Sequence, residues 1–222
     1  MTTGRGEAAM VLTNSDWPPV PMWSHRVPGQ VGRPPLVWLL GAHGGAGTTA
    51  LASSLSYAGD AHRRWPGLVG IGRDLDSPFV VVVGRTHMSG LAAVHHALLS
   101  HAHQATPTGV RLLGMITVAD SDRPLSKPTA TRRDTVEALA RDLHAVPWRL
   151  GWIEPWRTLE SHELPAWTPD HPRRVGERDP ARVPPAPVAG LAEQLFTTAR
   201  AAVTQLRQQP PTTDRSGRAE AG

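Results

Sequence analysis

The sequence contains no cysteine. This absence excludes disulfides, metal sites built on thiolates and cysteine nucleophiles. The chain also lacks an apolar run long enough to span a bilayer and an N-terminal signal-peptide pattern. We therefore expect a cytoplasmic protein without a membrane span, and 222 residues are enough for one well-buried domain with tails.

Lysine is almost absent, because Lys127 is the only one in the chain. The remaining basic side chains are arginine and histidine, and the net charge is only +4. A site that needs a compact ammonium group therefore cannot be built in most of the chain, and arginine is a poor substitute because its fork is planar. Weak, arginine-dependent association with nucleic acid stays open, although the charge balance does not demand it.

What the chain does contain is a glycine-rich loop between an apolar run at 36–40 and a helix-like segment at 49–55. The loop reads Gly41, Ala42, His43, Gly44, Gly45, Ala46, Gly47, Thr48 and Thr49. Glycines let consecutive backbone N–H groups converge on phosphate oxygens, and a hydroxyl such as that of Thr49 can bind Mg²⁺. The pattern predicts a phosphate-binding strand, loop and helix in which Thr48 takes the position of the usual lysine.

We predict that this loop, from Gly41 through Thr49 without Ala42, forms a nucleotide or phosphate site together with Arg85 and Asp120. Arg85 would reach over the loop from the neighbouring strand to supply the missing charge, and a surface ion pair is its alternative role. Asp120 follows a strand and would touch a base, a ribose or Mg²⁺, with an ordinary polar turn as the alternative. The expected ligand is ATP or another nucleotide with Mg²⁺ at Thr49, and we assign no catalytic residue.

Strand and helix patterns alternate along the rest of the core. Apolar runs at 79–83, 110–118 and 148–153 predict strands, and helical spacing predicts helices that start at Ser89 and near the capping-box pattern Thr131–Asp134. Connections of this length predict an α/β fold with a doubly wound, mostly parallel sheet and helices on both faces. The carboxyl ends of the strands would then share one rim, where ligands bind in such sheets.

Composition divides the chain into five segments. We expect an irregular N-terminal arm, a P-loop-like α/β core, a proline-rich strap, an amphipathic helix and a disordered tail, at 1–34, 35–160, 161–187, 188–208 and 209–222. Docking of the arm through Trp17 and Trp23 on the same chain is the simpler of two interpretations, a partner site being the other. The apolar stripe of the last helix, at 191–206, would pack on its own sheet or across a homodimer.

Two further groups of residues are candidate sites. His95, His96, His101 and His103 are close in sequence, but no pair is spaced four apart as a helical zinc site requires, so they predict a solvated helix face. Trp148, Leu150 and Trp152 alternate as a strand face does, while Trp156 lies past a proline and is a candidate for stacking on a base or a protein.

The sequence from about 35 to 160 resembles the ParA/MinD type of deviant P-loop ATPases, whose loop has the form K-G-G-x-G-K-[ST]. Residues 43–49 match that form with both lysines replaced. The cadence around Gly84–Gly90, Gly114–Asp120 and Leu150–Arg157 resembles an actinobacterial family commonly found beside conjugative or integrated elements. In the parent class an aspartate closes an apolar strand, whereas none of the aspartates between 56 and 78 does so here.

The missing lysines and carboxylate favour a non-hydrolysing, P-loop-like accessory or regulatory protein with a protein partner. The resemblance implies that it acts in plasmid or conjugative-element maintenance. Two alternatives stay open at this point. One is an unusual ATPase or GTPase in which Arg85 or a partner's arginine supplies the missing charge. The other is a nucleic-acid-associated module that uses its arginines.

Overall fold

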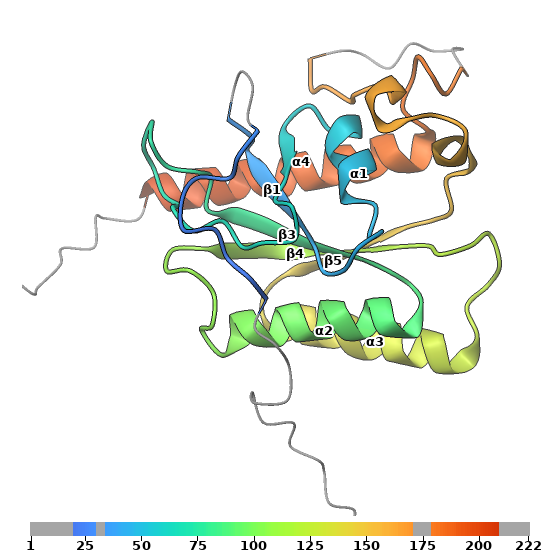
Figure 1. The fold of residues 1–222 in the computed structure, drawn as a ribbon, viewed down its shortest axis with the longest axis horizontal. Helices are drawn as coiled ribbons and strands as arrows, with labels where there is room; N and C mark the ends of the chain where they lie inside the picture. Colours follow the sequence, from blue (N-terminus) through green and yellow to red (C-terminus); the bar gives the residue numbers. More distant parts are fainter. Residues whose placement is uncertain (1–19, 30–33, 171–178, 209–222) are drawn as a thin grey trace, which may run out of the picture.

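A computed structural model describes residues 20–29, 34–170 and 179–208. Its centre is a sheet of five parallel strands (Figure 1). In chain order they are β1 Val37–Gly41, β2 Ala58–Asp60, β3 Phe79–Arg85, β4 Arg111–Val118 and β5 Val146–Leu150. The predicted α/β class, with a doubly wound parallel sheet, is confirmed.

Four α-helices in the described residues cover the two faces of the sheet. They are α1 Thr48–Ser54, α2 Met88–Ala102, α3 Lys127–Asp142 and α4 Ala186–Gln208. Helices α1 and α4 lie on one face, and α2 and α3 lie on the other (Figure 1). Successive side chains of each strand point to opposite faces of the sheet and belong to two separate apolar clusters. Val81 belongs to the cluster with α1 and α4, and Val82 belongs to the cluster with α2.

The strand order across the sheet is β2-β1-β3-β4-β5. Because β1 lies between β2 and β3, the chain moves outward from β1 in one direction and then crosses to the other side. Such a reversal creates a crevice between β1 and β3 at the carboxyl end of the sheet, where open α/β sheets bind ligands. Gly41 and Arg85, the last residues of these two strands, both lie at this edge.

Two helix starts differ from their predicted positions. Helix α2 is capped by His87 rather than Ser89, because the His87 Nδ1 accepts a hydrogen bond from the Gly90 N–H at 2.9 Å. Helix α3 begins at Lys127, capped by Ser126, and the predicted capping pattern at Thr131–Asp134 lies inside it. Proline in the first turn of α3 favours this earlier start, since its fixed φ suits that position.

Strand β2 was not predicted, and the predicted strand at 148–153 begins and ends earlier, as β5. The residues Ala58–Asp60 lack β-branched side chains, but they pair with β1 in parallel from Val37↔Ala58 to Leu39↔Asp60. The chain between β2 and β3 is irregular and covers the α2 face with Trp65, which is fully buried. Pairing with β1 therefore explains why residues 58–60 form a strand although their own β-propensity is low.

The described part of the predicted arm, residues 20–29, docks on the body of the same chain. The Trp23 N–H donates to the Trp65 carbonyl at 2.9 Å, and the Trp65 N–H donates to the Pro21 carbonyl at 2.9 Å. Asp76, fully buried, accepts a hydrogen bond from the Val27 N–H at 2.7 Å. Docking through Trp23 is thus confirmed, and Trp17 lies outside the described residues.

Helix α4 packs on its own sheet. Its stripe of Leu191, Leu195 and Ala199 is buried in the same cluster as β1 and β3. The Tyr57 hydroxyl donates to the Ala192 carbonyl at 2.6 Å, which ties α4 to the chain that leads into β2. Packing on its own sheet therefore accounts for the predicted stripe.

The chain that follows β5 includes two short 3₁₀ segments, Glu154–Arg157 and Ser161–Glu163. In the predicted strap, Trp167 donates its N–H to the Ser54 carbonyl at 2.9 Å, and residues 171–178 lie outside the described residues. Within 20–29, 34–170 and 179–208, no helix combines the length and apolar character that a membrane crossing requires.

Candidate functional site

The glycine loop lies where the strand order predicts a ligand, at the carboxyl end of β1. Gly45 and Gly47 have φ of +78° and +91°, a left-handed conformation that glycine adopts readily and other residues rarely do. Gly44, Gly45 and Thr49 are exposed, whereas Ala46 and Thr48 are buried under the loop and Gly41 is buried at the end of β1. The exposed backbone of Gly44 and Gly45 is therefore the accessible part of the predicted site.

His43 fastens the loop to the end of β3. Its Nε2 accepts a hydrogen bond from the Arg85 N–H at 3.0 Å, and its Nδ1 lies 2.8 Å from the Gly44 carbonyl oxygen. Both contacts form at once only when Nδ1 carries the proton and Nε2 does not. Burial lowers the pKa of His43 below 6.5, and the charges of His87, Arg85 and Arg63 lower it further against the raising effect of the Gly44 carbonyl. The sequence placed His43 in the loop, and the structure gives it this bridging contact.

Arg85 reaches from the end of β3 across the loop. Its Nε donates to the Gly45 carbonyl at 3.2 Å, and its Nη1 donates to the Ala119 carbonyl at 2.7 Å. Both partners are neutral carbonyls, and the described residues include no ion pair to Arg85. The structure therefore places its guanidinium on the loop as predicted, and the predicted alternative of a surface ion pair does not form there. Its charge is uncompensated by any carboxylate within hydrogen-bonding distance in the described chain.

Thr49, at the start of α1, forms a hydrogen bond with Asp60 at the end of β2. Its Oγ1 donates to the Asp60 Oδ2 at 2.9 Å, and the Asp60 Oδ1 accepts a hydrogen bond from the His62 N–H at 2.8 Å. A hydroxyl and a carboxylate are oxygen ligands of the kind that Mg²⁺ uses alongside phosphate oxygens and water. Thr49 and Asp60 are thus the residues that could hold the metal. No group of three or more metal-ligating side chains occurs in the part of the chain that the structure describes.

Arg63 is a site residue that the sequence did not single out. A side chain added at Gly44 would place its Cβ 3.8 Å from the Arg63 Nη1, so this guanidinium lies beside the exposed part of the loop. His62 and Arg63 have consecutive left-handed φ values of +52° and +60°, which are uncommon for residues other than glycine. Asp60 ends the three-residue strand β2 and Arg63 follows it, and no sequence pattern marks their approach to the loop.

The remaining predicted positions divide between the site and the core. Asp120 is exposed just past β4, and its N–H donates to the Thr86 Oγ1 at 3.1 Å, so it lies one residue from a carbonyl that Arg85 contacts. Trp156 packs partly buried against the core. Its indole N–H is buried without a hydrogen-bond partner in the described chain. Trp156 is therefore not an open stacking surface.

The prediction that the α2 histidines form a solvated helix face is wrong for His95 and His101, which are partly buried. The His95 Nδ1 lies 3.1 Å from the Arg132 Nη2, across the interface between α2 and α3. The His101 ring stacks on the Trp65 ring, with the two ring centroids 6.2 Å apart. Each of these histidines therefore has its own packing or hydrogen-bonding contact. Trp148 and Leu150 are buried in the core as predicted, whereas Trp152 lies beyond β5 and donates its indole N–H to Glu154.

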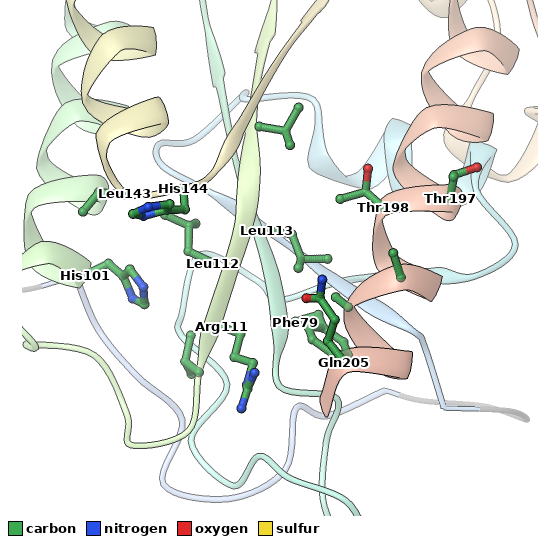
Figure 2. A pocket seen from close by; sticks show the side chains of 14 residues that line it. Phe79, His101, Arg111, Leu112, Leu113, Leu143, His144, Thr197, Thr198 and Gln205 are labelled. Carbon is green, nitrogen blue, oxygen red and sulfur yellow. The ribbon is translucent and has the colours of Figure 1, made fainter. Parts of the chain in front are cut away.

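A hollow of about 670 Å³ lies at the opposite, amino end of the sheet. Figure 2 shows side chains from α4, among them Thr198 and Gln205, on one side of it and His101 and His144 on the other, with Arg111 between them. It is an open, mixed surface without a convergent charged group. The carboxyl end of the sheet, by contrast, brings Arg63, Arg85 and the left-handed turn at His62 and Arg63 together beside the glycine loop.

Comparison with protein-family models, with curated proteins and with solved structures finds no match to this chain.

Proposed function

We propose that this protein binds the phosphates of a nucleotide through the Gly44–Thr49 backbone, with Arg85 in the place of the P-loop lysine, and does not hydrolyse them. The observation that carries the proposal is the contact of the Arg85 guanidinium with the Gly45 carbonyl. A cation from a neighbouring strand thereby lies on an exposed glycine loop. A guanidinium suits phosphate oxygens because its N–H groups form a fork with matching geometry.

The position of the loop supports the same proposal. It follows β1 at the reversal of strand order between β1 and β3, the edge at which doubly wound sheets bind their ligands. Left-handed glycines leave the backbone open to a close approach, and a side chain at Gly44 or Gly45 would fill that space. Helix α1 has only seven residues, so its dipole adds little and the charge must come from side chains.

Two features support binding without turnover. The lysine that neutralises the β- and γ-phosphates in P-loop enzymes has no counterpart at Thr48, which is buried. The Asp60 carboxylate accepts hydrogen bonds from Thr49 and His62, an arrangement that positions the loop rather than a water. The proposed role is that of an accessory or regulatory protein with a protein partner. Its place in plasmid or conjugative-element maintenance is supported by the sequence resemblance alone.

The proposal is tested by the thermal unfolding midpoint with ATP, ADP, GTP and GDP, each with and without Mg²⁺. A nucleotide present at about 100 times its Kd adds about 2.7 kcal/mol, which raises the midpoint by about 5 to 10 °C for a domain of this size. We expect Arg85→Ala and Gly47→Leu to abolish the rise, while Arg207→Ala, a charge removed at the end of α4, keeps it. Absence of a rise with every nucleotide at millimolar concentration would overturn the proposal.

The pairing of Thr49 with Asp60 favours a second candidate, a Mg²⁺-dependent nucleoside triphosphatase. In this alternative the metal would bind the Thr49 hydroxyl and the Asp60 carboxylate, and Arg85 would stabilise the transferred phosphoryl group. The discriminating measurement is release of inorganic phosphate from ATP and GTP. Turnover that requires Mg²⁺ and is lost in Thr49→Ala, Asp60→Asn and Arg85→Ala would replace binding alone as the function.

A further inference from the structure

We infer that Arg63 and Arg85 together clamp one terminal phosphoryl group over Gly44 and Gly45, so that the site selects ligands that end in a phosphate dianion. This inference rests on the proposed function and adds the residue that sets its specificity. Arg85 alone explains attraction of any phosphate. A second guanidinium at the other end of the same loop explains preference for a phosphate with three free oxygens.

The two arginines flank the exposed stretch of the loop. An ideal Cβ at Gly44 lies 3.8 Å from the Arg63 Nη1, and one at Gly47 lies 3.6 Å from the Arg85 Nη2. The backbone between them is exposed at Gly44 and Gly45. A phosphoryl group on that backbone would therefore have a guanidinium within reach at each end.

Arg63 is free to engage an anion. Across residues 20–29, 34–170 and 179–208 its side chain forms no hydrogen bond or ion pair with another residue. Its neighbour Arg64 differs, because the Arg64 guanidinium lies 4.9 Å from the centroid of the Trp23 ring. The pair of adjacent arginines thus has one side chain stacked on the arm and one left at the loop.

The local backbone explains why Arg63 points to the loop. Asp60 holds the turn from both sides, accepting from the His62 N–H and from the Thr49 hydroxyl at the start of α1. His62 and Arg63 then take consecutive left-handed conformations, and the Arg64 N–H closes the turn on the Ala61 carbonyl at 3.2 Å. Left-handed conformations of residues other than glycine are strained and persist where the surroundings fix them, often at ligand clamps.

The chemistry of the pair fits a dianion better than a monoanion. Each guanidinium donates two parallel hydrogen bonds to a phosphate, so two of them satisfy several oxygens of one group and neutralise both of its charges. A bridging phosphate within a chain carries one charge and has fewer free oxygens. The clamp therefore favours inorganic pyrophosphate, ADP and ATP over a phosphodiester such as cyclic AMP.

The test compares variants of adjacent arginines by isothermal titration calorimetry with ATP, ADP, pyrophosphate and cyclic AMP. Arg63→Gly removes the guanidinium and suits the left-handed φ, so the turn is retained. Arg64→Ala is the matched control, since it removes the same charge one residue away. We expect Arg63→Gly to weaken binding of ADP and ATP about tenfold or more, Arg63→Lys to recover part of the loss, and Arg64→Ala to leave affinity within about twofold.

Three outcomes separate the two proposals. A wild-type protein that binds none of the phosphate compounds overturns the proposed function and the clamp with it. A wild type that binds them, with equal affinities for Arg63→Gly and Arg64→Ala, overturns the clamp and leaves the proposed function standing. Equal affinity of the wild type for cyclic AMP and ADP also overturns the clamp, because it removes the preference for a terminal phosphate.

Discussion

At the scale of single residues, the His43 ring is the contact between the glycine loop and β3. Its Nε2 accepts from the Arg85 N–H, so a proton on Nε2 would replace an attractive contact with a clash of two donors. A protonated His43 ring would also be repelled by Arg85, Arg63 and His87, which already lower its pKa. The neutral ring is therefore part of the folded loop.

This arrangement predicts a loss of stability in acid. Because the folded pKa of His43 lies below 6.5, the unfolded chain binds the proton more readily. The free energy of unfolding should be at its full value above pH 6.5 and fall as the pH drops through the folded pKa. Burial also lowers the pKa values of His95, His96 and His101, so they add to the same slope. Urea unfolding from pH 8 to pH 5 measures the effect, and a His43→Ala variant with an unchanged slope would contradict the role of His43.

Gly90 gives a second prediction at this scale. A Cβ there would lie 2.6 Å from the Arg85 carbonyl oxygen and 2.9 Å from the His43 Nε2, so α2 could not start so close to the loop. We expect Gly90→Ala to cost about 1 to 3 kcal/mol, as overpacking does, and to weaken ligand binding. Gly190→Ala is the matched control because its Cβ would meet open space on α4, and it should stabilise by up to about 1 kcal/mol. Chemical denaturation measures both, and equal effects would refute the steric explanation.

At the scale of elements, Glu137 joins α3 to β5. Its side chain is buried with 2% exposure, and both of its oxygens contact Arg149 of β5 at 2.7 Å. Arg141 and Arg133 reach the same carboxylate from within α3. The hydrogen bonds to Glu137 raise the pKa of Arg149, and the charges of Glu137 and Asp134 raise it further.

Removal of Glu137 should therefore destabilise the edge of the sheet. We expect Glu137→Ala to lower the free energy of unfolding by about 1.5 to 3 kcal/mol, the range for hydrogen bonds to charged groups. Asp134→Ala is the control, since Asp134 contacts the same Arg149 at 3.2 Å but is 59% exposed and should contribute less than about 1 kcal/mol. Equilibrium unfolding in urea measures both variants. Losses of the same size would show that burial does not set the strength of this contact.

The elements also show how far sequence reasoning reaches. Strands β1, β3 and β4 were predicted because continuous runs of apolar residues are typical of buried parallel strands. Strand β2 was missed because Ala58–Asp60 has no such run, and its pairing depends on β1. For the same reason Asp60 and Arg63 were missed as site residues, since a left-handed turn and a neighbouring strand bring them to the loop. The start of α3 was misplaced although Ser126 and the proline after Lys127 marked it, because the pattern at Thr131–Asp134 competed.

At the scale of the whole molecule, the sheet has two separate cores, and α4 supplies much of one. Leu195 of α4 is fully buried in the apolar cluster on the α1 and α4 side of the sheet. We expect Leu195→Ala to cost about 2 to 5 kcal/mol through lost burial and the cavity left behind. Thr204→Ala, an exposed change on the same helix, should stay within about 0.5 kcal/mol. Thermal and urea unfolding measure both, and a small loss at Leu195 would mean that α4 is dispensable for this core.

The late position of α4 has a consequence for synthesis on the ribosome. Strands β1, β3 and β4 emerge early, but the face that Leu195 covers stays open to water until residues 186–208 have left the exit tunnel. A nascent chain halted near residue 185 would expose the valines and leucines that α4 covers in the folded protein, which is the kind of surface that chaperones bind and that aggregates. The glycine loop is thus translated long before the helix that completes this face of the sheet.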